Sequence, residues 1–251
     1  MDDGVLRSRL WDGFARLQIL LGRHAMQGAV IERPGVVASV VPAAPESPTL
    51  NAAVALDPEQ AAQALPEIAE AWREAKVARW GVWLDGRAKR VARALQKAGL
   101  ALTASSPGMG ADLDDIWLPG DLDGRVPKAD LATVGKINDL AYGNTDGRLQ
   151  RTLTPLPRGV LTGYRVDLNG RPAAAALVMY HQHDCGVSFV ATIPEARRRG
   201  LGSLVMYGAL QEARERGCTS TTLQATEAGR RLYDSLGYHW LCDMQLWEQR
   251  L

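Results

Sequence analysis

Cysteine is scarce in this 251-residue sequence. The three cysteines, Cys185, Cys218 and Cys242, are odd in number and widely spaced, which excludes a CxxC metal knuckle and argues against a disulfide framework. A protein without disulfides fits a reducing compartment, so we expect a cytoplasmic location.

An excess of charge of either sign is also missing. Twenty-nine basic residues stand against 28 acidic ones. A protein whose main partner is a nucleic-acid backbone should carry a clear basic excess, so we expect no nucleic-acid partner.

Long apolar runs are missing as well. The apolar run at residues 17–21 is too short for a signal sequence or a membrane span, so we expect neither an exported nor a membrane protein. The 46% of hydrophobic and 23% of charged residues are typical of a soluble globular protein long enough for two ordinary domains.

Periodic patterns predict alternating helices and strands in two halves. In the first half we expect helices at 4–22, from Asp57 onward and at 89–98, with strands at 29–32, 36–41, 50–56 and 79–85. Asp57-Pro58 has the composition of a helix start, and Pro66 should kink or restart that helix. The stretch 103–124 is rich in glycine, proline and aspartate, which indicates a linker. We therefore expect domains at 1–102 and 125–251.

The second half repeats this alternation. A helix at 129–141 precedes strands at 160–168 and 172–180, joined by an Asn-Gly turn, then a turn at 184–186 and a strand at 187–193. The order helix, strand, helix, glycine, strand occurs in both 58–104 and 200–247, which leaves open a duplication or a chance similarity. The fold class is α/β or α+β.

The stretch EARRRGLGSLVM, at 195–206, places three arginines before a Gly-x-Gly and an amphipathic helix. A helix N-terminus carries unpaired N–H groups and partial positive charge, and glycines let the backbone approach an anion closely. Arginines there oppose the helix dipole unless an anion lies among them. A solvated basic turn is the alternative, but the charge pattern favours a phosphate loop.

Residues 190–206, VATIPEARRRGLGSLVM, resemble the acyl-CoA-binding motif of the GNAT superfamily of N-acetyltransferases, with Arg197, Gly200 and Gly202 at the motif positions. A second block, LQATEAGRRLYDSLGY, resembles that family's next strand and helix. The resemblance covers about residues 125–250, and the first half matches only as a degenerate copy. It implies a GNAT fold, with a mixed, mostly antiparallel sheet flanked by helices, in two related halves.

The resemblance also implies a reaction, in which an acetyl group passes from acetyl-CoA to the amine of a small molecule or peptide. The cofactor-binding residues are then the strand that pairs with the pantetheine arm and the loop whose amides hold the pyrophosphate: Val190, Ala191, Thr192, Arg197, Arg198, Arg199, Gly200, Leu201, Gly202 and Ser203. A binding module that holds acyl-CoA without turnover is the alternative.

Tyr233 is the candidate catalytic residue, as the acid that protonates the departing thiolate. We expect Ala228, Leu232 and Leu236 to face the core, so that Tyr233, about 100° round the helix, reaches a cleft. Thr226 and Gly229 stand where many members of the family have asparagine and alanine, which changes the shape of the pocket more than its chemistry.

The general base is unassigned, with His183, Asp184 or a chain of water molecules as the options. His181 and His183 with Asp184 and Cys185 could bind a metal, but an exposed hairpin tip explains the pattern without one, and we expect no metal site. Asp139 and Tyr142 lie near the end of a helix that borders the acceptor pocket in GNAT proteins.

Overall fold

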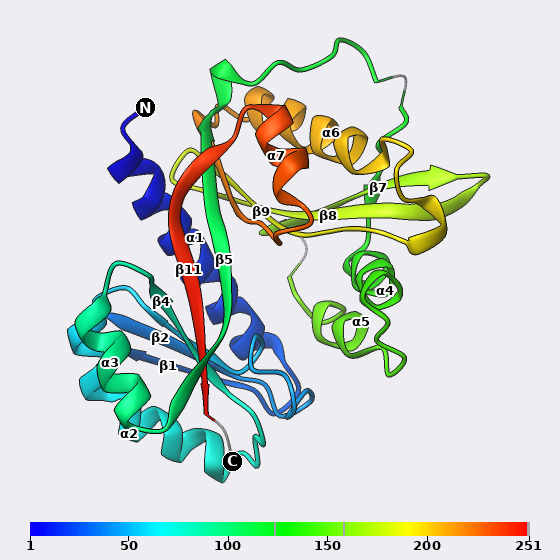
Figure 1. Cartoon of the computed structure of the whole chain (residues 1–251). Coiled ribbons are helices and arrows are strands. Elements are labelled where there is room, and N and C mark those ends of the chain that lie inside the picture. Colours follow the sequence, from blue (N-terminus) through cyan, green and yellow to red (C-terminus); the bar gives the residue numbers. More distant parts are fainter. Residues whose placement is uncertain (123, 158, 250–251) are drawn as a thin grey trace. The chain divides into compact units, whose positions relative to one another are not determined.

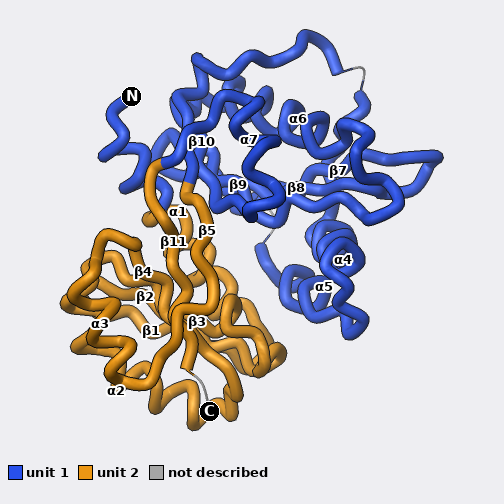
Figure 2. Tube along the Cα trace, viewed as in Figure 1, with its two compact units in different colours: residues 1–10, 109–240 blue, residues 11–108, 241–251 orange. Residues whose placement is uncertain are grey.

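The computed structural model describes residues 1–122, 124–157 and 159–249. The chain forms two compact units, and Figure 2 shows them in different colours. Unit 1 comprises residues 1–10 and 109–240, and unit 2 comprises residues 11–108 and 241–251. Each unit therefore contains residues from both halves of the sequence.

Unit 2 is a sheet with helices. Its elements are most of α1 (Asp3–His24), β1 (Ala29–Arg33), β2 (Val36–Val40), β3 (Ala52–Ala55), α2 (Pro58–Glu74), β4 (Gly81–Asp85), α3 (Lys89–Lys97), most of β5 (Leu100–Asp112) and most of β11 (His239–Gln249). In Figure 1 its strands β1 to β4 are blue to cyan, β5 is green and β11 is red. The strand order is β1-β2-β3-β4-β11-β5. All pairings from β1 to β11 are antiparallel except β3 with β4.

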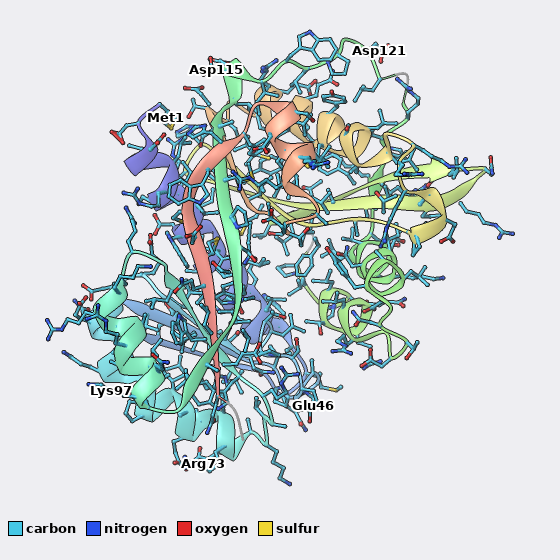
Figure 3. The ribbon with its side chains drawn as sticks, viewed as in Figure 1. Met1, Glu46, Arg73, Lys97, Asp115 and Asp121 are labelled. Atoms are coloured by element: carbon cyan, nitrogen blue, oxygen red, sulfur yellow. The ribbon has the colours of Figure 1, made fainter. Side chains whose placement is uncertain are left out.

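The core of unit 2 lies between the sheet and helices α2 and α3. It includes Trp72 and Trp80, whose rings stack with centroids 4.6 Å apart, and Trp247 from β11. Charged side chains such as Arg73 and Lys97 lie on the outer side of these helices (Figure 3). α2 begins as expected at Asp57, but it runs through Pro66 without a break, because this proline lies on the exposed side of an otherwise strongly amphipathic helix.

Unit 1 contains the remaining elements. They are the end of β5, a short 3₁₀ turn at Leu113–Asp115, β6 (Lys128–Ala129), α4 (Leu131–Tyr142), α5 (Arg148–Leu153), β7 (Leu161–Leu168), β8 (Arg171–His181), β9 (Asp184–Thr192), α6 (Leu201–Glu215), β10 (Ser220–Gln224) and α7 (Arg230–Leu236). The strand order is β5-β10-β9-β8-β7-β6, with β9 and β10 parallel and the pairs from β6 to β9 antiparallel. This mixed, mostly antiparallel sheet with flanking helices confirms the expected fold class.

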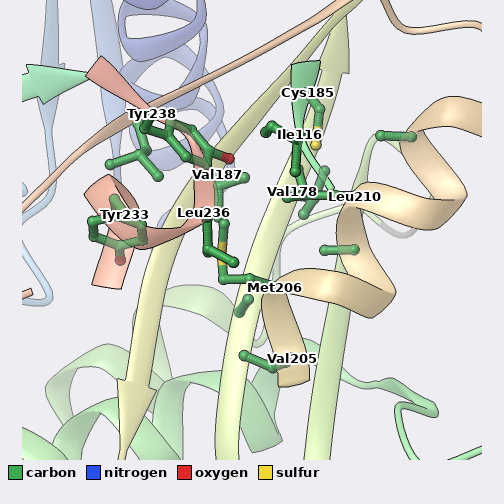
Figure 4. Close-up of a cluster of buried hydrophobic side chains, with 14 of the residues drawn as sticks. Ile116, Val178, Cys185, Val187, Val205, Met206, Leu210, Tyr233, Leu236 and Tyr238 are labelled. Carbon is green, nitrogen blue, oxygen red and sulfur yellow. The ribbon is translucent and has the colours of Figure 1, made fainter. Parts of the chain in front are cut away.

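The core of unit 1 forms where α6 packs on the sheet. The expected apolar stripe of α6 is buried, with Val205, Met206 and Leu210 completely covered. Figure 4 shows these side chains together with Leu236 and Tyr238. The buried stripe thus holds α6 on the sheet of unit 1.

The two halves of the sequence share one order of elements. Strands β1, β2, β3, helix α2, β4, α3 and β5 correspond to β7, β8, β9, α6, β10, α7 and β11, and the pairing directions agree, since the first three strands are antiparallel and the fourth is parallel to the third. The last strands are exchanged. β4 has β11 as its neighbour, and β10 has β5.

This exchange corrects the expected linker at 103–124. Residues 103–112 belong to β5, and Met109 and Ala111 are buried in the core of unit 1. Strand neighbours in both units override the loop-like composition, because β propensity depends on context. The boundaries of the two units therefore differ from the expected domains at 1–102 and 125–251.

Two smaller details also differ from expectation. The turn after β8 is Gln182-His183, both with positive φ, and not 184–186, because Asp184 and Cys185 are buried in β9. Within the described residues, no helix is long and apolar enough to cross a membrane.

Candidate functional site

The site predicted from the sequence lies in unit 1, at the carboxyl end of β9. The ladder between β9 and β10 runs only as far as Val187 and Leu223. Along residues 1–122, 124–157 and 159–249, no strand pairs with Val190, Ala191 or Thr192 on that side, so the edge expected for a pantetheine arm is open. On the other side β9 stays paired with β8.

A β-bulge marks the point where the edge opens. The register between β8 and β9 shifts between Ala175 and Leu177, and Phe189 has a φ of 51°. The buried Asn138 of α4 donates from its amide to the carbonyl oxygens of Phe189 at 2.8 Å and Val134 at 3.0 Å. The sequence analysis missed Asn138, and its only signal was a polar residue on the apolar face of a helix.

The loop at 197–203 leads from β9 into α6 through a left-handed glycine. Gly200 has a φ of 75° and is the N-cap residue of α6, and no side chain caps this helix. Arg197, Arg198 and Arg199 are exposed. The N–H groups at the start of α6, from Leu201 to Ser203, are thus left without intrahelical partners.

Gly202 brings the loop close to α7. A Cβ atom built there would lie 3.3 Å from Leu232 Cδ2 and 3.8 Å from Thr192 Oγ1. A Cβ here would be tight against the end of the Leu232 side chain and in ordinary contact with Thr192, so glycine leaves the closest approach to α7. The loop, the open edge of β9 and the residue next to Tyr233 therefore meet in one place.

Tyr233 is more deeply buried than expected. Only 6% of its surface is exposed, and its ring packs edge-on against Tyr238 with centroids 5.8 Å apart (Figure 4). Its hydroxyl has no hydrogen bond to any residue that the structure describes, yet it is not among the fully buried polar atoms without a partner.

The expected orientation of α7 was wrong in detail. α7 begins at Arg230, so Ala228 lies outside the helix and is exposed, whereas Tyr233 and Leu236 face the core. Thr226 Oγ1 accepts a hydrogen bond from the N–H of Gly229 at 3.1 Å, just before the helix. A Cβ at Gly229 would lie 3.3 Å from the Tyr233 ring. Glycine in place of the alanine that is common in the family therefore leaves more room for the tyrosine ring.

Tyr142 and Arg197 lie close enough to the loop and Tyr233 to affect the pKa values of the tyrosines there. Burial raises the pKa of Tyr233, and the nearby Tyr142 raises it further. Desolvation raises the pKa of the Tyr142 phenol, and the nearby Arg197 guanidinium acts in the lowering direction. Asp139, by contrast, has a structural contact, since its carboxylate accepts from the N–H groups of Leu149 and Gln150 in α5.

His183 and Asp184 lie at the opposite end of β9 from this site, so neither can serve as its base. Asp184 is buried, and its carboxylate accepts hydrogen bonds from Ser220 at 2.5 Å and Thr222 at 2.7 Å. The pKa of this carboxyl is raised, because the effect of burial is larger than the opposing effect of the two hydroxyl donors. The stretch at 181–185 therefore belongs to the folding of unit 1 and not to the site.

The corresponding place in unit 2 is already filled by a side chain. α2 is the counterpart of α6, and the Asp57 carboxylate accepts a hydrogen bond from the N–H of Gln60 at 3.0 Å. A carboxylate thus occupies the helix end where α6 leaves its N–H groups open.

Residues 140–238 match the family model of the acetyltransferase (GNAT) family. The chain contains a GNAT acetyltransferase domain. The GNAT domain includes the open edge of β9, the loop, α6 and α7, which are the elements named above, and it is an acyltransferase domain by family. No curated protein matches the chain in sequence.

Solved structures share the fold over nearly the whole chain. A GCN5-related N-acetyltransferase from Kribbella flavida is 21% identical, with a TM-score of 0.70 over 97% of this chain and 95% of that one. A functionally unknown conserved protein from Staphylococcus epidermidis is 11% identical, with a TM-score of 0.59 over 87% and 92%. A GCN5-related glucosamine N-acetyltransferase region of a fungal multi-domain protein is 14% identical, with a TM-score of 0.55 over 98% of this chain and 37% of that one.

Proposed function

We propose that the protein transfers an acetyl group from acetyl-CoA to a primary amine of a small molecule or a peptide. The observation that carries this proposal is the uncapped, left-handed start of α6 beside the open edge of β9. A helix end with free N–H groups binds the pyrophosphate, and the unpaired strand edge hydrogen-bonds to the amide groups of the pantetheine arm. The acyl thioester then lies near Tyr233.

The cofactor-binding residues of this proposal are those expected from the sequence, at 190–192 and 197–203. Two features of the loop favour an anion over empty solvent. Three arginines precede the helix end, where cations destabilise a helix unless a negative group lies among them. Gly200 and Gly202 leave no Cβ between the backbone and that group.

The chemistry is direct transfer. A neutral amine attacks the thioester carbonyl, a C–N bond forms, and N–H groups of β9 near Ala191 stabilise the oxyanion. The C–S bond then breaks, and the thiolate takes the proton of the Tyr233 hydroxyl, which solvent restores. The amine loses its proton to water, since His183 and Asp184 lie at the other end of β9.

Burial affects the proposed acid in two ways, because it keeps Tyr233 protonated and also makes it a weaker proton donor than a free phenol. Because its pKa is raised, Tyr233 keeps its proton throughout the neutral and mildly alkaline range. A thiol, with an ordinary pKa of about 8.5, is a fair leaving group by comparison.

The decisive experiment measures thiol release from acetyl-CoA with a panel of amines. The panel includes amino acids, a peptide with a free N-terminus and glucosamine, the last because of the fungal region with a similar fold. We expect release with at least one amine. Binding of acetyl-CoA with no thiol released for any amine would instead support the binding-module alternative.

A further inference from the structure

The side chain of Arg197 joins two elements of the GNAT domain. Its Nε donates to the carbonyl oxygen of Thr192 at 3.2 Å, and its Nη2 donates to the carbonyl oxygen of Ala141 at 2.6 Å. Thr192 ends β9, and Ala141 lies in the last turn of α4. One guanidinium therefore connects the cofactor strand with the end of α4.

Both contacts are favourable on physical grounds. The last four carbonyl groups of a helix have no intrahelical partner, and the helix dipole places partial negative charge there. Ala141 is followed by Tyr142 and by Gly143, the left-handed C-cap residue of α4. A cation donating to the Ala141 carbonyl both satisfies this group and balances the dipole.

A second contact ties α4 to the same strand. Asn138 donates to the carbonyl of Phe189 at the bulge, one turn before Ala141. Asn138 and Arg197 thus hold the last turn of α4 against the two ends of the open edge of β9. Tyr142, the last residue of α4, directly follows the held Ala141, it is near enough to Tyr233 to raise the pKa of that phenol, and 59% of its surface is exposed.

We propose that the Arg197 side chain is a positioning residue for the amine acceptor, because it fixes Tyr142 beside Tyr233, while the backbone that follows it serves the cofactor. The exposed ring of Tyr142 then forms the acceptor side of the reacting centre. This inference rests on the proposed acetyl transfer. It gives the Arg197 side chain a task other than the phosphate contact expected from the sequence.

The test compares Arg197→Gln and Arg197→Lys with the wild type. Glutamine can donate at only one of the two positions, whereas lysine keeps the charge at the end of α4. We expect Arg197→Gln to lower kcat/KM for the amine by about 10- to 100-fold, since small displacements at a reacting centre have effects of this size. The Kd for coenzyme A should change by much less than this, because Arg198, Arg199 and the loop backbone remain, and Arg197→Lys should restore part of kcat/KM. Tyr142→Ala should also lower kcat/KM for the amine, through a higher KM for the amine.

Arg93→Gln is the matched control, because Arg93 is an exposed arginine of α3 in unit 2 and its loss changes the net charge equally. Hydrogen exchange gives a readout that needs no turnover. The N–H groups of Gly143 and Asn144 donate to the carbonyls of Leu140 and Asp139, and they should exchange faster in Arg197→Gln than in Arg93→Gln.

The proposal is overturned if Arg197→Gln weakens coenzyme A binding while the KM for the amine and the exchange rates stay unchanged, because Arg197 would then be a simple phosphate contact. If the wild type releases no thiol with any amine, the proposed function fails on its own evidence. Hydrogen exchange then tests the contact of Arg197 with the end of α4 separately, and unchanged rates at Gly143 and Asn144 would count against it.

Discussion

Tyr233 combines a buried ring with a hydroxyl that no described residue binds. Replacing it with phenylalanine removes the hydroxyl and keeps the packing against Tyr238. If Tyr233 is the general acid, Tyr233→Phe should lower kcat by about 10²- to 10⁴-fold with little change in the KM for acetyl-CoA. Steady-state kinetics would show this, and an undiminished kcat would remove Tyr233 from the mechanism, provided chemistry limits the wild-type rate.

The pH profile tests the same residue in a second way. A general acid works only while it is protonated, and burial raises the pKa of Tyr233 above its ordinary value of about 10. The alkaline loss of kcat should therefore begin only above about pH 10 in the wild type. Solvent protonation of the thiolate would leave the same alkaline limb in Tyr233→Phe.

Gly200 and Gly217 form a natural pair for testing the phosphate loop. They lie just before and just after α6, their φ angles are 75° and 76°, and no atom lies within 4 Å of a Cβ at either position. Alanine should destabilise the fold by a similar amount at both, about 1 to 2 kcal/mol, since left-handed backbone disfavours a Cβ.

Only Gly200→Ala should also weaken coenzyme A binding. Coenzyme A raises the melting temperature of the wild type if it binds the folded loop and not the unfolded chain. We expect this shift to shrink in Gly200→Ala, to vanish when Gly200 and Gly202 are both valine, and to persist in Gly217→Ala. Equal shifts in all variants would show that the phosphate lies elsewhere.

At the scale of elements, helix α6 is held to the sheet by a charged network at its far end. Glu212 accepts hydrogen bonds from Tyr164 of β7 at 2.7 Å, Lys128 of β6 at 3.0 Å and Arg216 at 2.7 Å. Burial acts to raise the pKa of this carboxyl, but the three donors outweigh it and the pKa is lowered.

The sign of that shift gives a prediction for stability. A carboxyl whose pKa is lower in the folded state stabilises the fold at pH values above its unfolded pKa, which is about 4.3 for glutamate. This stabilisation is lost as the pH falls through the folded-state pKa. Glu212→Gln should therefore be less stable than the wild type at pH 7, and the difference should shrink below about pH 4. Urea unfolding at several pH values measures it, and a difference that does not depend on pH would contradict the role of the charge.

The elements that the sequence predicted well are those with strong local signals. The Asp57 cap, the Asn169-Gly170 turn and the α6 stripe each depend on a few neighbouring residues, and each is present. The part of β5 after residue 104 was missed because its Gly-, Ser- and Pro-containing sequence resembles a loop, and only distant strands make it part of a sheet. Local propensity cannot report such partners.

The features of the candidate site also divide into those with a local sequence signal and those without one. The loop and the open edge of β9 followed from a motif of consecutive residues, and the structure brings Thr192, Gly202 and Leu232 together. The contacts of Asn138 with Phe189 and of Arg197 with Ala141 join segments more than 50 residues apart, so no local pattern could indicate them. The burial of Tyr233 was also hidden, because it depends on where α7 begins.

At the scale of the whole molecule, the two units differ at the one helix end that matters for the cofactor. α6 leaves its first N–H groups open, whereas Asp57 already supplies a carboxylate to α2. We therefore expect one acetyl-CoA per chain, measured by calorimetric titration. A stoichiometry near two would show that unit 2 holds a second site.

Trp247 tests the exchange of the last strands. It belongs to β11, at the end of the half that carries the GNAT domain, yet it is 7% exposed in the core of unit 2. Trp247→Ala should destabilise unit 2 by about 3 to 5 kcal/mol, as large aromatic truncations do. Hydrogen exchange should then quicken in α2 and α3, and faster exchange confined to α6 and α7 would contradict the assignment of β11 to unit 2.

The same exchange bears on how the chain is made. A ribosome releases residues from the N-terminus onward, so α1 to β4 emerge long before residues 241–249, which provide the neighbour of β4. During that interval β4 has an unpaired edge, and such edges are prone to pairing with other chains. The nascent first half must therefore wait until residues 241–249 have been made before its sheet is complete, and a chain released before that point would expose the edge of β4 for as long as it persisted.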